Sequence, residues 1–155
     1  MAHLRGVLAR KQGRFAGVPK KPRADRSEHD EQRDVVGWFR VQHRDITWCL
    51  VASANGLALG GTPAQKAAHW AKFLAAGGCP GHADLHLMVM RGGYGGLFIE
   101  MKKERATKAD VTDDQLAFIG MAIQQGYAAT WCAGFHEAVS VINEYLQGEC
   151  SWMGK

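Results

Sequence analysis

Three features are scarce in this sequence: long hydrophobic runs, cysteine, and acidic residues near the amino terminus. Apolar runs such as "GLALGG" and "LHLMVM" are far shorter than the roughly 18 residues that a membrane-spanning helix needs. The basic start lacks the continuous apolar segment and the cleavage pattern of a secretory signal. The four cysteines are too few and too scattered for a disulfide framework. We therefore expect an intracellular protein with reduced thiols and no membrane contact.

The scarcity of acids near the start makes the charge uneven. Residues 1–26 hold eight lysines and arginines and one acid, a net charge of +7, whereas residues 27–155 carry −3. We predict a flexible basic arm over residues 1–26, because glycine, proline and lysine disfavour independent folding there. Such an arm suits nucleic acid, since each phosphate contact releases counterions; a merely solubilising tail is the alternative. The candidate DNA contacts are Arg10, Lys11, Arg14, Lys20, Lys21 and Arg23, together with Lys103.

The rest of the chain alternates helical and strand patterns. With 46% apolar residues it fits one domain of modest core. Ser27, Thr62 and Thr112 are predicted to cap helices. In chain order we expect helix 28–42, strand 46–52, helix 63–76, two strands within 83–103, helix 113–125, strand 127–133 and helix 135–146. This order indicates a mixed α/β domain with one central sheet. Four tryptophans on apolar faces are expected in the core: Trp38, Trp48, Trp70 and Trp131.

The stretch "ADLHLMVMRGGYGGLFIEMKK", residues 83–103, places charges at the ends of a predicted hairpin. Glu100 and Lys102 project from the same face of one strand. In an antiparallel hairpin, positions whose numbers sum to about 184 to 186 face each other, so Asp84 lies opposite Glu100, Met101 or Lys102. Carboxylates are the ligands that Mg²⁺ prefers, and a lysine can orient or deprotonate a neighbouring water. This spacing is common by chance and on its own favours a hairpin with a surface ion pair; a metal site is the alternative, and the motifs around the cluster favour it.

Four short motifs surround this cluster. They are Gly81, Asp84 and Leu85; Glu100 and Lys102; Thr112 and Gln115; Gly126 and Tyr127. In order and spacing they resemble the VRR-NUC family of the PD-(D/E)xK nuclease superfamily, whose motifs are G-x-P-D-L, E-x-K, S/T-x-x-Q and G-Y. The acidic stretch "SEHDEQRDVVGWF" is similar to the family's first helix. The resemblance covers about residues 27–147, and it departs from the pattern at Ala83, where the family has proline.

The resemblance implies a fold and a site. The fold is α/β and restriction-endonuclease-like, with a central mixed sheet flanked by helices; residues 27–147 are the nuclease domain and residues 148–155 a short tail. Mg²⁺ or Mn²⁺ is the implied cofactor, bound by Asp84, Glu100 and the backbone carbonyl of Met101. Lys102 serves the attacking water, and Gln115 lies near the site. An acid of the first helix completes it: Glu31 is favoured because it leads into the apolar stripe, and Glu28, on the same helix face, is the alternative.

The implied function is that of a metal-dependent DNA endonuclease. Family members in which the domain stands alone resemble phage-type proteins that act as homodimers on branched DNA such as the Holliday junction. A role in replication, recombination or repair in the cytoplasm of a bacterial or phage-infected cell follows. Two alternatives stay open: a non-catalytic nucleic-acid-binding protein, and a linear-DNA nuclease or nickase of the same superfamily.

Overall fold

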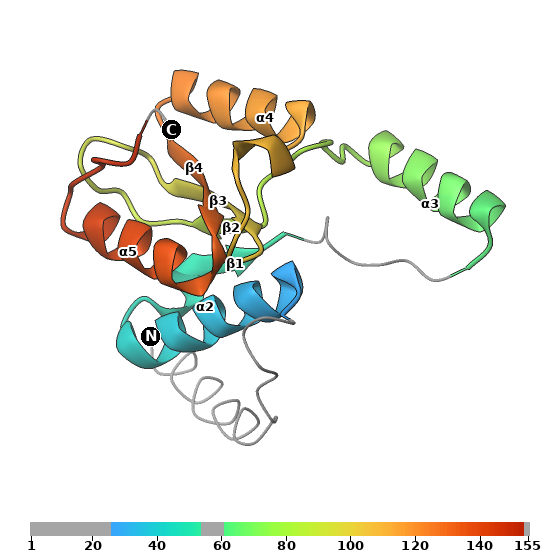
Figure 1. Cartoon of the computed structure of the whole chain (residues 1–155). Helices are drawn as coiled ribbons and strands as arrows, with labels where there is room; N and C mark the ends of the chain where they lie inside the picture. The colour runs from blue at the N-terminus through green and yellow to red at the C-terminus, as the bar shows by residue number, and fades with distance from the viewer. Residues whose placement is uncertain (1–25, 54–60, 154–155) are drawn as a thin grey trace, which may run out of the picture.

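The computed structural model describes residues 26–53 and 61–153, and Figure 1 shows how they are arranged. Six of the candidate DNA contacts in the basic arm, Arg10 to Arg23, lie outside the described residues. In chain order the elements are α2 (Glu28–Gln42), η3 (Thr47–Cys49), β1 (Leu50–Ala52), α3 (Pro63–Ala75), β2 (Leu85–Leu87), β3 (Leu97–Lys102), η4 (Lys108–Asp110), α4 (Asp113–Gln124), β4 (Ala128–Ala133) and α5 (Gly134–Leu146).

The four strands form one mixed sheet in the order β1-β2-β3-β4. The pairs β1–β2 and β2–β3 are antiparallel, and β3–β4 is parallel. The mixed α/β prediction is therefore confirmed. Leu85 pairs with Ile99 and Leu87 with Leu97, so the hairpin has the register that the sequence predicted. Continued by one residue, this register sets Asp84 opposite Glu100.

The two faces of the sheet pack against different helices, as Figure 1 shows: α2 and α5 lie on one side and α4 on the other. On β3, Leu97, Ile99 and Met101 point into the larger core with α2 and α5. Phe98 packs on the opposite face, against the smaller cluster that includes Phe118 of α4. Since side chains alternate along a strand, Glu100 and Lys102 lie on the α4 face with Phe98. The charged residues thus sit where the apolar cluster of that face ends.

Each of the predicted caps is present. The hydroxyls of Ser27, Thr62 and Thr112 accept hydrogen bonds from backbone N–H groups three residues later, and a side chain returns the bond in all three capping boxes. Such caps satisfy N–H groups that have no partner within the helix. Gly126, at φ +83°, follows α4 in the left-handed conformation that glycine adopts without strain. Local sequence signals therefore fix the helix boundaries.

Two predictions about apolar residues are wrong. The predicted strand 46–52 is shorter: Thr47–Cys49 forms a 3₁₀ turn, and only Leu50–Ala52 pairs with β2. The Thr47 hydroxyl donates to the carbonyl of His43 at 3.1 Å, which holds the chain in a turn after α2. Trp48 and Trp70 are not in the core, because they are 54% and 50% exposed. Trp70 belongs to α3, which buries none of its residues and extends away from the sheet (Figure 1).

The last described residues join the core. Trp152 is 7% exposed and packs in the larger cluster with Cys150 and Met153 at its margin. The described part of the predicted tail is therefore folded onto the domain. None of the described helices combines the length and the hydrophobicity that a bilayer crossing requires.

Candidate active site

A cavity of about 490 Å³ gathers five of the eight predicted site residues that the structure describes. Its walls come from the start of α2, from α3, from the loop before β2, from the end of β3 and from the first turn of α4. The lining includes Glu28, His29, Gln32, Trp70, Gly81, His82, Asp84, Glu100, Lys103 and Gln115. Five sequence-predicted residues therefore meet here: Glu28, Asp84, Glu100, Lys103 and Gln115.

Asp84 is held in place by the backbone of β3. Its Oδ2 accepts a hydrogen bond from the N–H of Met101 at 2.9 Å. Its own carbonyl accepts from the N–H of Ser53 at 2.8 Å, which extends the β1–β2 ladder by one residue. The Gln32 amide of α2 also reaches that carbonyl, at 3.4 Å. The carboxylate thus has one oxygen tied to the strand that carries Glu100.

Glu100 and Lys102 form a buried ion pair. The two residues are 3% and 5% exposed, and Lys102 Nζ lies 3.2 Å from Glu100 Oε1. Burying charges costs free energy unless they are paired and hydrogen-bonded. A sheet surface that held only aliphatic side chains would avoid this cost. The charged pair is therefore better explained by chemistry at the cavity than by stability.

The Gln115 side chain links a helix cap to the acid pair. Its Oε1 accepts from the N–H of Thr112 at 3.0 Å, so the amide is fixed as part of the capping box of α4. Its Nε2 donates to Oε1 of Glu100. The T-x-x-Q motif thus has two functions: it starts the helix and aims one amide N–H at the carboxylate. This explains why the glutamine belongs at the third position after the threonine.

Burial raises the pKa of both cavity acids, Asp84 and Glu100. Burial raises the pKa of Glu100 to about 7, with a further rise from the Asp84 carboxylate and an opposing effect from Lys102. The pKa of Asp84 is also raised, chiefly by burial, while the Met101 N–H and Lys102 oppose the rise. Glu28 adds repulsion to both carboxylates. Negative charge is therefore concentrated at a place where solvent stabilises it poorly, and a bound cation would relieve this.

The donor set fits a hard divalent cation. Mg²⁺ is commonly held by one or two carboxylates and completes its shell with waters and a substrate phosphate. Asp84 and Glu100 supply two carboxylates, and Glu28 lies on the same cavity. Within residues 26–53 and 61–153, no three His, Cys, Asp or Glu side chains form a ready-made metal cluster. A site of this kind would therefore depend on water and phosphate as further ligands.

The two acids of the first helix have different surroundings. Glu31 is 2% exposed, and its Oε2 accepts from the N–H of Phe135 at 2.8 Å, in the first turn of α5. Arg26 Nε lies 3.2 Å from its Oε1. Glu31 is not among the described residues that line the cavity, whereas Glu28 is. The structure therefore brings Glu28 to the site and gives Glu31 a place at the positive end of the α5 dipole.

Gly81 of the first motif is required by a close contact. It has φ +73°, and a Cβ there would lie 2.3 Å from the carbonyl carbon of Asp114. The loop that leads to Asp84 therefore passes directly over the first turn of α4, which carries Gln115. A larger residue would push Asp84 and Gln115 apart. At the position of the family's proline, Ala83 is 1% exposed and packs in the smaller core cluster.

Sequence reasoning missed four residues of the cavity: His29, Gln32, Trp70 and His82. Gln32 lies four residues after Glu28 on α2, so helical spacing could have found it once Glu28 was chosen, whereas His29 directly follows Glu28 and does not share its face. Trp70 had no such signal, because its pattern is that of an ordinary apolar helix face.

The fold is similar to that of a solved structure described as "VRR_NUC domain protein". The two structures superpose with a TM-score of 0.66 and are 26% identical, and the match covers 81% of this chain and 92% of the other. No family model and no curated protein matches the sequence. The structural match therefore spans most of both chains.

Proposed function

We propose that this chain, whose fold is similar to that of a VRR_NUC domain protein, is a metal-dependent DNA endonuclease of that family. It hydrolyses phosphodiester bonds and prefers branched DNA such as the Holliday junction. One observation carries the proposal. Asp84 and Glu100 share a cavity with Gln115, and Lys102 is paired to Glu100 at 3.2 Å on the strand beneath. A protein that only binds nucleic acid gains nothing from two acids with raised pKa values in its binding site, because their negative charge repels the DNA phosphates.

In this proposal Asp84, Glu100 and the Met101 carbonyl hold Mg²⁺ or Mn²⁺, and Glu28 assists them from α2. The cation, when bound, supplies Lewis-acid charge at the phosphate and lowers the pKa of water. Lys102 Nζ orients the attacking water and offsets negative charge that develops on the phosphorus oxygens. Gln115 keeps the Glu100 carboxylate in one orientation. Lys103, exposed on the rim, contacts the DNA backbone.

A homodimer fits the proposed substrate. Two copies related by a two-fold axis present two cavities, which suits paired cuts in the symmetric strands of a junction. The proposed setting is replication, recombination or repair, where such structures arise.

The deciding experiment is cleavage of a labelled four-way junction, a flap, a linear duplex and a single strand, each with Mg²⁺, Mn²⁺ or EDTA. We expect cleavage with either metal, none in EDTA, and paired symmetric cuts in the junction at the highest rate. Equal rates on junction and linear duplex would contradict the branched-DNA preference. Binding without cleavage in any metal would identify a non-catalytic binding protein instead.

Replacing the two helix acids separately should give opposite results. Glu31→Gln breaks the buried ion pair with Arg26 and weakens the hydrogen bond from the Phe135 N–H, so the free energy of unfolding should fall by about 2–3 kcal/mol with cleavage retained in the folded fraction. Glu28→Gln should leave stability within about 0.5 kcal/mol and lower cleavage about 10-fold or more. Urea unfolding and single-turnover cleavage at low temperature measure both. If the folded Glu31 variant lost as much cleavage as the Glu28 variant, Glu31 would be the site acid.

A further inference from the structure

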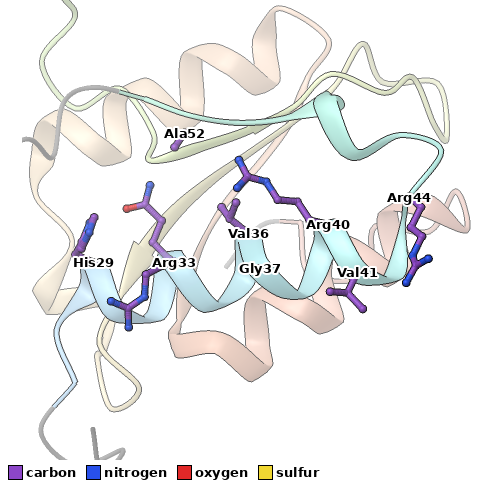
Figure 2. Close-up of a pocket in the computed structure, with 9 residues that line it drawn as sticks. His29, Arg33, Val36, Gly37, Arg40, Val41, Arg44 and Ala52 are labelled. Atoms are coloured by element: carbon purple, nitrogen blue, oxygen red, sulfur yellow. The ribbon is translucent and has the colours of Figure 1, made fainter. Parts of the chain in front are cut away.

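A second hollow, of about 460 Å³, runs along the exposed side of α2. Figure 2 shows its lining: the side chains of Arg33, Arg40 and Arg44 stand along the helix, with Val36, Gly37 and Val41 between them. Ala52 of β1 closes the opposite side. We call this hollow the arginine groove. No acidic side chain is among the described residues that line it, so it combines an apolar floor with one sign of charge.

The spacing of the arginines follows from the helix. Positions 29, 33, 36 and 40 advance by three or four residues and so share one face of α2, and Arg44 follows in the turn after the helix ends. From Arg33 to Arg40 this face extends about 10 Å at the rise of an α-helix, which equals the rise of about three nucleotides in one strand of a duplex. Arg33 is 45% exposed in its side chain and pairs with Asp30 at 3.2 Å. An exposed pair of this kind contributes little stability, so a phosphate can replace the acid.

The arginine groove leads into the catalytic cavity. His29 and Gln32 line both hollows, so the two are neighbours at the start of α2. Glu28 of the proposed metal site directly precedes His29. A polyanion lying in the groove therefore points one end at Asp84 and Glu100. This continuity favours nucleic acid over an acidic protein segment, which would have no reason to approach the acids.

We propose that the arginine groove binds the phosphate backbone of the DNA strand that enters the catalytic cavity. The inference rests on the proposed nuclease function and adds a binding track to it. Arginine forks match phosphate oxygens and stay charged at any working pH. Because its helical part alone is about three nucleotides long, the groove positions the strand beyond the scissile phosphate. Its contribution should appear in substrate affinity, with the rate at saturating DNA unchanged.

The test compares two triple variants of the full chain. In the first, Arg33, Arg40 and Arg44 become glutamine; in the second they become lysine, which keeps the charge. Binding of a labelled junction and duplex is measured by anisotropy in EDTA from 50 to 200 mM salt. Each lost phosphate contact should reduce the magnitude of the slope of log K against log salt by about 0.9. The slope of the glutamine variant should therefore be smaller by about 2 to 3, and this variant should bind DNA about 10- to 100-fold more weakly. The lysine variant should keep a slope close to that of the wild type.

A matched control removes a surface charge far from the groove. Arg91→Gln changes an exposed arginine in the β2–β3 turn, outside both hollows, and should alter the slope by less than the single variant Arg40→Gln. Cleavage at saturating DNA with Mg²⁺ should be the same for the glutamine triple variant and the wild type. If the glutamine triple variant had an unchanged salt slope while the wild type cuts DNA, the proposed DNA-binding role of the arginine groove would be wrong and the proposed nuclease function would stand. A wild type that neither binds nor cuts DNA would overturn the proposed function together with it.

Discussion

Replacing Lys102 by glutamine should lower the rate of phosphodiester cleavage by about 10²–10⁴-fold, with DNA binding changed by less than about two-fold. Lys102 is 5% exposed and lies behind Glu100, so it contributes little to the encounter with DNA. Its ammonium nevertheless lies 3.2 Å from Glu100 Oε1, and its proposed effect is to orient water and to stabilise charge that exists only in the transition state. Loss of such an interaction lowers kcat and kcat/KM equally.

The adjacent residue supplies the control. Lys103 carries the same charge, is exposed and lines the cavity, so Lys103→Gln should raise KM several-fold and leave kcat nearly unchanged. Single-turnover cleavage over a range of protein concentrations separates the two effects. A Lys102 variant that kept full kcat, or that differed from wild type only in KM, would contradict its proposed role. Circular dichroism and urea unfolding show whether either variant is misfolded.

The hairpin explains why much of the site could be predicted. Strand side chains alternate with a period of two residues, and a tight turn fixes the register of the two strands. The sequence positions of Asp84, Glu100 and Lys102 therefore predict that the three lie together at one end of the hairpin. The register Leu85 with Ile99 confirms that placement. The cap Thr112 was equally readable, because S/T-x-x-E/Q is a local signal. In both cases the relevant contacts connect residues that are close in sequence or joined by one turn.

Contacts between distant elements could not be predicted in the same way. Glu28 and Glu31 share a helix face, and only the packing of α5 shows that Glu31 is engaged by the N–H of Phe135, 104 residues away. The arginine groove depends equally on where Ala52 of β1 lies beside α2. Trp70 was expected in the core because its helix is apolar on one side, yet α3 has no partner among the described elements that buries it. The spacing of apolar residues predicts which face of a helix is apolar. Which element packs against that face depends on tertiary structure, which the spacing does not contain.

The second large effect concerns the free energy of unfolding. Glu100→Gln should stabilise the protein in EDTA at pH 8 by about 1–3 kcal/mol, a rise in Tm of several degrees, while abolishing cleavage with Mg²⁺. The reason is that Glu100 has a pKa of about 7 in the folded protein against an ordinary value of 4.5. At pH 8 the folded chain must carry a carboxylate that burial and Asp84 disfavour. Glutamine resembles the protonated acid in shape and removes that cost.

The pH dependence tests the cause. Between about pH 4.5 and 7 the folded wild type holds a proton on Glu100 that the unfolded chain has released, so its free energy of unfolding falls as the pH rises. The stability gap between Glu100→Gln and wild type should therefore be small near pH 4.5, widen up to about pH 7 and stay constant above it.

Glu149→Gln, which removes an exposed acid outside the cavity, should show no such widening. Urea unfolding in EDTA at half-unit pH steps measures the gap. A gap that did not change with pH would mean that glutamine acts through packing, and a destabilised variant at pH 8 would mean that the ion pair with Lys102 outweighs the burial of the carboxylate.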